Sequence, residues 1–337
     1  TISNLNPHDI AITGASFDDS QFTTSQSFPL NMGYYSSADI QFTFTPNATG
    51  AQSGTLQLSS PDIIASNTYG EFALSGNGFD LSDGVVQVPG EVPTIQEAID
   101  ASSDGDTVLV AAGTYVENLV FGGKNLSLIG ADSSNTIIDG DSVSQVINLN
   151  NGEDSTSVIK NFTLRNGIGF EGNGSAILMG GGANGGYGPK LENLCITQNY
   201  GGAIKSFGST FSLKNSRIIN NHDWGIGFQY LQLSTLDNVI ISGNQGRGVD
   251  IERSGASPVF NNVTISNNVG GNGAGVRCKD QASPTFTNCV ISNNTASGTG
   301  GGIYAENNGY PILNNCEVSG NTSQGAGGGI CLDGGHI

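Results

Sequence analysis

Four charged residues occupy matching positions in two consecutive repeats, and their types could support acid–base chemistry. Asp250 and Glu252 are separated by one residue, and Arg277 and Lys279 have the same spacing one repeat later. Cleavage of a uronic acid polymer by elimination needs a cation that neutralises the sugar carboxylate and a base that removes the adjacent C–H proton. Asp250 and Glu252 could hold calcium, which takes oxygen ligands, and Arg277 or Lys279 could be the base. One hypothesis is therefore a calcium-dependent polysaccharide lyase.

The same charged residues have a structural explanation. Acidic and basic rows on neighbouring strands form a ladder of ion pairs that stabilises a sheet by about 0.2–1 kcal/mol per pair. Opposite charges that face one another on a surface need no catalytic role to account for them. We therefore favour the ion-pair ladder over catalysis and keep the lyase as the alternative.

Residues close to these charges could contact a carbohydrate. Lys205 and Tyr304 belong to one outward column of the repeat and Glu306 to the other, and Trp224 lies in the segment HDWG. A Trp side chain can stack on a sugar ring or pack against a turn, because one end of it is apolar and the other is polar. We take these four residues as candidate ligand-binding residues.

Two other enzyme chemistries find less support. Residues 84–337 contain no Asp-Asp or Gly-His-Gly signature, and the sequence has no Cys/His spacing that fits a zinc site. A glycoside hydrolase would need carboxylates about 5–9 Å apart. The carboxylates that could supply such a pair are Asp250, Glu252, Glu306 and Asp333.

These side chains are positioned by a repeat that fills the second half of the chain. Each unit opens with Asn in the pattern N-x-x-[ILV]-x-x-N, and successive openings tighten to intervals between 22 and 27 residues, which is the size of one solenoid coil. A second column, mostly preceded by Gly, consists of Ile177, Ile204, Ile226, Val249, Val276, Ile303 and Ile330. The opening residues are Asn161, Asn193, Asn215, Asn238, Asn262, Asn288 and Asn315.

Stacked parallel coils turn these columns into ladders. Equivalent residues lie about 4.8 Å apart, and alternation along a strand sends Ile303 inward while Tyr304 and Glu306 point outward. Parallel crossovers are almost always right-handed, so a right-handed β-helix is predicted. One outward ladder is Lys205, Gly227, Asp250, Arg277, Tyr304 and Cys331, and the other is Phe207, Gln229, Glu252, Lys279, Glu306 and Asp333.

The Asn that closes each unit is predicted to have two roles. Its amide can stack on the amides of neighbouring coils, and Asn tolerates the left-handed backbone of a tight turn. These roles are structural rather than ligand-binding. The closing residues include Asn221, Asn244, Asn268, Asn294 and Asn321.

The first part of the chain follows a different pattern. Residues 1–80 contain alternating segments such as IAITGASF and SGTLQLSS between turn-rich clusters, which favours an immunoglobulin-like antiparallel β-sandwich. The β-helix is predicted over residues 84–337. It opens with a short helix, N-capped by Thr94, whose Ile95, Ala98 and Ile99 share one face and seal the end of the stack. The predicted fold class is therefore all-β.

Composition narrows the function. The net charge of −18 repels phosphate backbones, so nucleic acid is excluded as a partner. No apolar run is long enough for a membrane span. The 51 Gly and the low share of charged residues, 12%, are typical of a secreted β-protein. Five Cys cannot all pair, and we expect Cys289 and Cys316, at equivalent positions, to be buried thiols.

Four family resemblances agree with this organisation. The segment VPTIQEAIDASSDGDTVLVAAGTYVENLVF resembles the start of the pectin-lyase-like right-handed parallel β-helix superfamily. FTFTPNATGAQSGTLQLSS followed by FALSGNGF resembles a Hydin-type, choice-of-anchor immunoglobulin-like module, which implies a spacer or docking unit. SPTFTNCVISNN and GYPILNNCEVSGN resemble repeats of bacterial cell-surface β-helix proteins, and GGAI has a partial likeness to chlamydial polymorphic outer-membrane proteins.

The favoured prediction is a non-enzymatic extracellular or cell-surface repeat protein. It would contact a polysaccharide, a cell-surface glycan or other copies of itself, with no certain cofactor and calcium as a possible one. Its coils are short and even, whereas enzymes of this fold surround a cleft with long loops; the segment from Gly169 to Pro189 is the one longer excursion. Thr1 falls inside the first module and Ile337 falls mid-coil, so we expect a piece of a longer chain.

Overall fold

The structure of the chain is a computed structural model that describes residues 1–5, 7–46, 50–61, 71–78, 83–169, 174–180, 186–230 and 232–337. The chain divides into two compact units, Thr1–Asp83 and Gly84–Ile337. Parts of the predicted excursion, residues 170–173 and 181–185, lie outside the described residues. Among the described residues, no helix has the length and apolar character needed to cross a membrane.

The first unit is built from small antiparallel sheets. They gather around a core of Ile12, Met32, Leu56 and Leu58, and most of the predicted alternating segments contribute strands. The immunoglobulin-like arrangement stays a prediction. The pairs are β1 (Ile2–Ser3) with β6 (Ser37–Ala38), β2 (Ile10–Ile12) with β5 (Leu30–Met32), and β4 (Phe22–Thr23) with β7 (Thr43–Phe44); the three-stranded sheet is β3 (Gly14–Phe17), β8 (Gly50–Ser59) and β9 (Glu71–Gly78).

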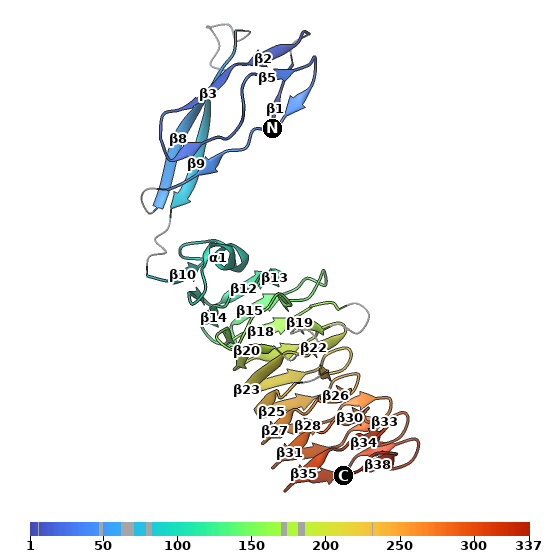
Figure 1. The fold of residues 1–337 in the computed structure, drawn as a ribbon. Coiled ribbons are helices and arrows are strands. Elements are labelled where there is room, and N and C mark those ends of the chain that lie inside the picture. The colour runs from blue at the N-terminus through green and yellow to red at the C-terminus, as the bar shows by residue number, and fades with distance from the viewer. Residues whose placement is uncertain are drawn as a thin grey trace. The chain divides into compact units, whose positions relative to one another are not determined.

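The second unit is a parallel β-helix in which every strand pairs with its equivalents on neighbouring coils (Figure 1). Its largest sheet has 17 strands: β10 (Val85–Val88), β11 (Thr107–Val110), β12 (Gly113–Val116), β14 (Ser127–Gly130), β15 (Thr136–Asp139), β17 (Val158–Lys160), β18 (Thr163–Arg165), β20 (Tyr187–Glu192), β21 (Cys195–Thr197), β23 (Thr210–Ile219), β25 (Thr235–Ser242), β27 (Val259–Asn261), β28 (Thr264–Ser266), β31 (Thr285–Thr287), β32 (Val290–Ser292), β35 (Ile312–Asn314) and β36 (Glu317–Ser319).

Two further parallel sheets complete the coils. A sheet of nine strands carries the Gly-Ile column and the candidate site, and a sheet of three strands forms in the later coils. The nine strands are β13 (Leu119–Val120), β16 (Ile147–Leu149), β19 (Gly174–Gly180), β22 (Gly202–Phe207), β24 (Ile226–Gln229), β26 (Val249–Glu252), β30 (Val276–Lys279), β34 (Ile303–Glu306) and β38 (Ile330–Asp333). The three strands are β29 (Val269–Gly270), β33 (Thr295–Ala296) and β37 (Thr322–Ser323).

Apolar ladders fill the interior of the β-helix, as the repeat predicts. The aliphatic column from Ile177 to Ile303 is fully buried, and its members pair in register from coil to coil. A second ladder is aromatic: the ring centroids of Phe260 and Phe286 lie 4.4 Å apart, and Phe228 packs edge-on against Phe260. Burial of these side chains at about 25 cal/mol per Å² provides the main stabilisation of the stack.

The helix α1 (Ile95–Ala101) begins where the sequence predicts. The Thr94 hydroxyl accepts a hydrogen bond from the backbone N–H of Glu97 at 3.2 Å, which satisfies one of the free amides at the start of the helix. Ile95, Ala98 and Ile99 are buried, and α1 contacts β10, β11 and β13, the first strands of the stack (Figure 1). The role of α1 in sealing the end of the stack stays a prediction.

The Asn residues divide the two predicted roles between different positions. The closing Asn form a buried amide ladder: Asn244 Nδ2 donates to Asn268 Oδ1 at 2.9 Å, and Asn221 Nδ2 donates to Asn244 Oδ1 at 2.9 Å. The left-handed backbone belongs instead to the opening Asn and to the residue just before the closing one, such as Asn267 (φ +57°). Assigning the left-handed turn to the closing Asn was therefore wrong. A side chain cannot both stack inside the coil and stand at the exposed corner.

The cysteines are free thiols. Cys289 is buried and Cys316 is half-buried, and both donate to backbone carbonyls, Cys289 to Thr287 O at 3.3 Å and Cys316 to Asn314 O at 3.3 Å. Burial raises the pKa of Cys289 to about 11, so this thiol stays protonated and packs like a small apolar side chain.

Candidate functional site

The candidate site is the outer face of β22, β24, β26, β30 and β34. Strand pairing confirms the predicted register of both outward ladders, because Asp250 pairs with Arg277 and Glu252 pairs with Lys279. The first row is Lys205, Gly227, Asp250, Arg277 and Tyr304, and the second row is Phe207, Gln229, Glu252, Lys279 and Glu306.

Arg277 is the centre of an ion-pair network on this face. Its Nε and Nη2 donate to the two oxygens of Asp250, each at 2.7 Å, and Nη2 also contacts Glu252 Oε1. Lys279 Nζ lies 3.5 Å from the same Glu252 oxygen, and Arg247 Nη1 lies 3.9 Å from Asp250 Oδ2. These side chains are mostly buried, so the network joins two neighbouring coils through charge-assisted hydrogen bonds.

This network limits the chemistry predicted for its members. Burial acts to lower the pKa of Arg277, but the hydrogen bonds to Asp250 and the charges of Asp250 and Glu252 outweigh burial, so the pKa is raised. A general base must be deprotonated before it can accept a proton from the substrate. Arg277 holds its own proton more firmly than a free arginine and so fits this role poorly. The lyase role of Arg277 and Lys279 stays a prediction without geometric support.

The carboxylates do not fit calcium in this arrangement. Calcium takes six to eight oxygen ligands, whereas both oxygens of Asp250 already accept hydrogen bonds from a guanidinium. The part of the chain that the structure describes contains no group of three or more His, Cys, Asp or Glu placed to bind a metal ion.

Lys205 differs from the other cations of this face. Its side chain is only 7% exposed, and Nζ lies 5.3 Å from the ring centroid of Phe207 and 5.4 Å from that of Trp224. Among the described residues, no carboxylate lies within ion-pair distance of Nζ. Burial lowers the pKa of Lys205, although the charges of Asp250 and Glu252 partly oppose this shift. A buried ammonium without a carboxylate at ion-pair distance is costly, because the two rings and the more distant charges of Asp250 and Glu252 compensate for desolvation only in part.

Trp224 lies across two glycines that make room for it. A Cβ on Gly202 would lie 1.9 Å from Trp224 Cζ2, and a Cβ on Gly227 would lie 3.1 Å from Trp224 Cζ3 and 3.3 Å from Lys205 Nζ. The indole is half-buried, and its backbone N–H donates to Asp223 Oδ1 at 2.9 Å. We call the cluster of Lys205, Phe207, Trp224 and the bare Gly227 the Lys205 notch.

Tyr304 and Glu306 lie further along the same rows. Tyr304 is 5% exposed, because the glycine-rich turns of Gly273 and Gly300 pass close to its Cβ, and its hydroxyl donates to Asp333 Oδ2 at 3.0 Å. Burial, reinforced by this hydrogen bond, raises the pKa of Tyr304 to about 12. Glu306 is half-buried beside Lys279. The structure therefore brings Lys205 and Trp224 together, while Tyr304 is covered.

Sequence reasoning missed several members of the site. Arg247 joins the network from a turn, where its Nε donates to Asn272 O at 2.7 Å, and no repeat marks it. Phe207 was placed in an outward row without a function. The signal that could have revealed the notch is Gly227, the single glycine in the first row between Lys205 and Asp250.

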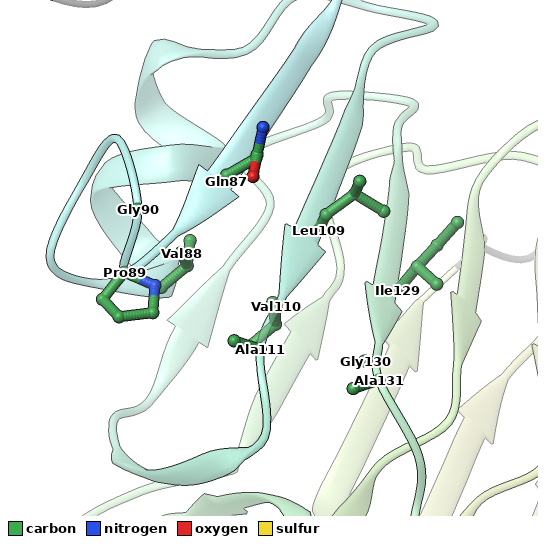
Figure 2. A pocket seen from close by; sticks show the side chains of 10 residues that line it. All are labelled: Gln87, Val88, Pro89, Gly90, Leu109, Val110, Ala111, Ile129, Gly130 and Ala131. Carbon is green, nitrogen blue, oxygen red and sulfur yellow. The ribbon is translucent and has the colours of Figure 1, made fainter.

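A shallow pocket of about 470 Å³ lies elsewhere, on the outer face of the first coils (Figure 2). Gln87, Leu109 and Ile129 project from three neighbouring strands, with Pro89 and Gly90 at its side. Its lining is almost entirely apolar and contains no charged side chain. It lacks the groups needed for acid–base chemistry or for binding an anion, so we place the candidate site at the Lys205 notch.

Comparison with solved structures finds proteins of low sequence identity. The similar solved structures include a pectate lyase, with 15% identity over 66% of this chain and 68% of that chain and a TM-score of 0.48. They also include a pectin methylesterase from Aspergillus niger, with 18% identity over 72% of this chain and 86% of that chain and a TM-score of 0.46. Another is the catalytic domain of an α-1,3-glucanase, with 12% identity over 99% of this chain and 77% of that chain and a TM-score of 0.45. No match was found among curated proteins.

The family comparison covers most of the β-helix. The family described as right handed beta helix region matches residues 131–298 and 261–335, which together exceed half of the chain. This match agrees with the predicted handedness of the coils. The chain belongs to the right-handed β-helix family.

Proposed function

We propose that this protein is an extracellular or cell-surface β-helix protein that binds an acidic glycan at the Lys205 notch without cleaving it. The observation that carries the proposal is Lys205 itself, a buried ammonium with two aromatic rings beside it and, among the residues that the structure describes, no carboxylate within ion-pair distance. A sugar carboxylate would supply the missing counter-charge, and a sugar ring could stack on Trp224.

The overall charge makes a specific site necessary. At −18 the protein repels a polyanion at long range, so binding has to come from short-range contacts. Arg277 and Lys279 have carboxylates within the protein, and their charges are largely balanced there. Among the cations that the structure describes on this face, Lys205 is the buried one with no carboxylate at ion-pair distance, and we propose that it takes the external anion. Location outside the cell is supported by the low charged fraction, 12%, and the 51 Gly.

Binding can be followed with the protein's own fluorescence. Trp224 is the single tryptophan, so its emission reports the notch alone. We expect trigalacturonate to change this emission in a saturable way, and maltotriose, an uncharged control, to leave it unchanged. Lys205→Met, which keeps the apolar stem, should lose the response. An equal response in Lys205→Met, or no response of the wild type to any acidic oligosaccharide, would refute the proposal.

A polysaccharide lyase remains a second candidate because one observation favours it: the pKa of Lys205 is lowered, as a proton-accepting lysine requires. Elimination creates a double bond in the product that absorbs ultraviolet light. Incubation with polygalacturonate, with and without calcium, should give a flat absorbance trace if the protein only binds. A rising trace that persists in Arg277→Ala and Lys279→Ala would establish a lyase and exclude those two residues as its base.

A further inference from the structure

One turn position follows the second row of the outer face on every coil from β22 to β38. The residue after each of these strands has a left-handed backbone, with φ between +50° and +79°. Glycine, Asn and Asp adopt this conformation easily, whereas bulky residues rarely do. The six residues at this position are Gly208, Tyr230, Arg253, Asp280, Asn307 and Gly334.

Tyr230 and Arg253 do not fit the conformational requirement of the turn. Their φ angles are +70° and +79°, and neither has a side chain suited to this region. Four other coils use Gly, Asp or Asn at the same place, so the turn itself does not call for a large side chain. Strained bulky residues that persist in a regular repeat point to a role other than folding.

The two exceptions occur together and beside the Lys205 notch. They follow β24 and β26, the coils that carry Gly227 and Asp250, and the Arg253 guanidinium lies 4.6 Å from the ring centroid of Tyr230. Arg253 is exposed, and among the described residues no carboxylate lies within ion-pair distance of it. Tyr230 is three residues from Gly227, which is about 10 Å along a strand.

We infer that Tyr230 and Arg253 form a second contact of the glycan site, in which Arg253 binds the carboxylate of a sugar distant from the one held at Lys205. This inference rests on the proposed glycan binding and extends it. Arginine suits this contact because its planar fork matches a carboxylate, and Tyr230 holds the fork in place by stacking. Because Tyr230 lies about 10 Å along the strand direction from Gly227, we assign the two contacts to different sugars. The ligand is therefore an acidic oligosaccharide of at least two residues.

The test uses glycine, the residue that other coils place at this turn. Arg253→Gly and Tyr230→Gly should lower the affinity for trigalacturonate, Arg253→Gly by about 10-fold or more, since a charge-assisted hydrogen bond is lost. Their melting temperatures without ligand should stay the same or rise, because glycine removes the strain. Asn307→Gly, the same change two coils beyond Arg253, is the matched control and should leave the affinity unchanged.

The outcomes separate this inference from the proposed function. If Lys205→Met abolishes binding while Arg253→Gly and Tyr230→Gly bind like the wild type, the second contact is wrong and the Lys205 notch stands. If the glycine variants melt at a lower temperature and keep full affinity, the pair is structural and the inference is overturned. If the wild type binds no acidic oligosaccharide, both proposals fail.

Discussion

Gly202→Ala is the sharpest test of how the Lys205 notch is built. The added methyl would lie 1.9–2.1 Å from three atoms of the Trp224 indole, which is far inside van der Waals contact. The Gly202 backbone is part of β22 and pairs within the stack, so it cannot retreat. We therefore expect Trp224 to swing away from the sheet into solvent.

The cost follows from the surface that the indole loses. A Trp side chain buries about 150–250 Å² when fully covered, and Trp224 is about half-buried, so roughly 100 Å² becomes exposed. At about 25 cal/mol per Å² this is about 2.5 kcal/mol. Lys205 also loses one of its two rings, which adds about 0.5–1 kcal/mol. We expect the free energy of unfolding to fall by about 3–3.5 kcal/mol.

Two measurements check this prediction. The emission maximum of Trp224 should shift to the red, and urea unfolding followed by far-ultraviolet circular dichroism should show the loss of stability. Gly329→Ala is the matched control, because a Cβ there meets only Val318 Cγ1 at 3.9 Å; its emission and stability should match the wild type. An unchanged emission maximum in Gly202→Ala, with a stability change below about 0.5 kcal/mol, would show that the indole does not lie on Gly202.

Two further predictions concern the interior ladder and the charge of Lys205. Asn244→Ala should lower the free energy of unfolding by about 3–6 kcal/mol in urea. The reason is that the Asn221 backbone and side-chain N–H groups and the Ile218 carbonyl lose their buried partner. Asn267→Gly, at an exposed left-handed corner, is the control and should leave the stability unchanged. Lys205→Met should be more stable than the wild type at neutral pH. Between the lowered pKa of folded Lys205 and the ordinary lysine pKa of about 10.4, the unfolded wild-type chain binds more protons than the folded protein. The wild type therefore gains stability as pH rises through this window, and the advantage of Lys205→Met should shrink. A stability difference that does not change with pH would contradict this prediction.

The sequence predicts the architecture well because every coil repeats the same physical requirement. A single Gly-Ile column sets which side chains face the interior, and alternation then fixes the outward rows, including the pairing of Asp250 with Arg277. The two roles of Asn were harder to separate. Both the stacked amide and the left-handed corner favour Asn, and only the burial of Asn244 against the exposure of Asn267 distinguishes them.

The site was predictable only in part because its decisive contacts run between residues of different coils that no pattern links. Trp224 leans back over Gly202 of the preceding coil, and the absence of a side chain at Gly227 is what lets Lys205 lie beneath the indole. The strain at Tyr230 is a property of backbone angles. In the sequence, Tyr230 follows a predicted strand, and no pattern shows that other coils place Gly, Asp or Asn at the equivalent position.

Gly227 is also the position from which a carboxylate could neutralise Lys205, because it pairs with Lys205 on the neighbouring strand. The chain has 29 acidic and 11 basic residues, so a carboxylate next to a buried lysine would be easy to supply. An Asp at 227 would stand directly opposite Lys205 on the neighbouring strand, as Asp250 stands opposite Arg277. Gly227→Asp should therefore act as a built-in ligand. It should abolish trigalacturonate binding and raise the pKa of Lys205, so that the alkaline pH dependence of stability disappears. Gly227→Asn fills the same space without charge and should block binding while the pH dependence persists. If the stability of both variants depends on pH in the same way, a carboxylate at position 227 does not pair with Lys205, and the proposed role of Lys205 in binding a carboxylate is wrong.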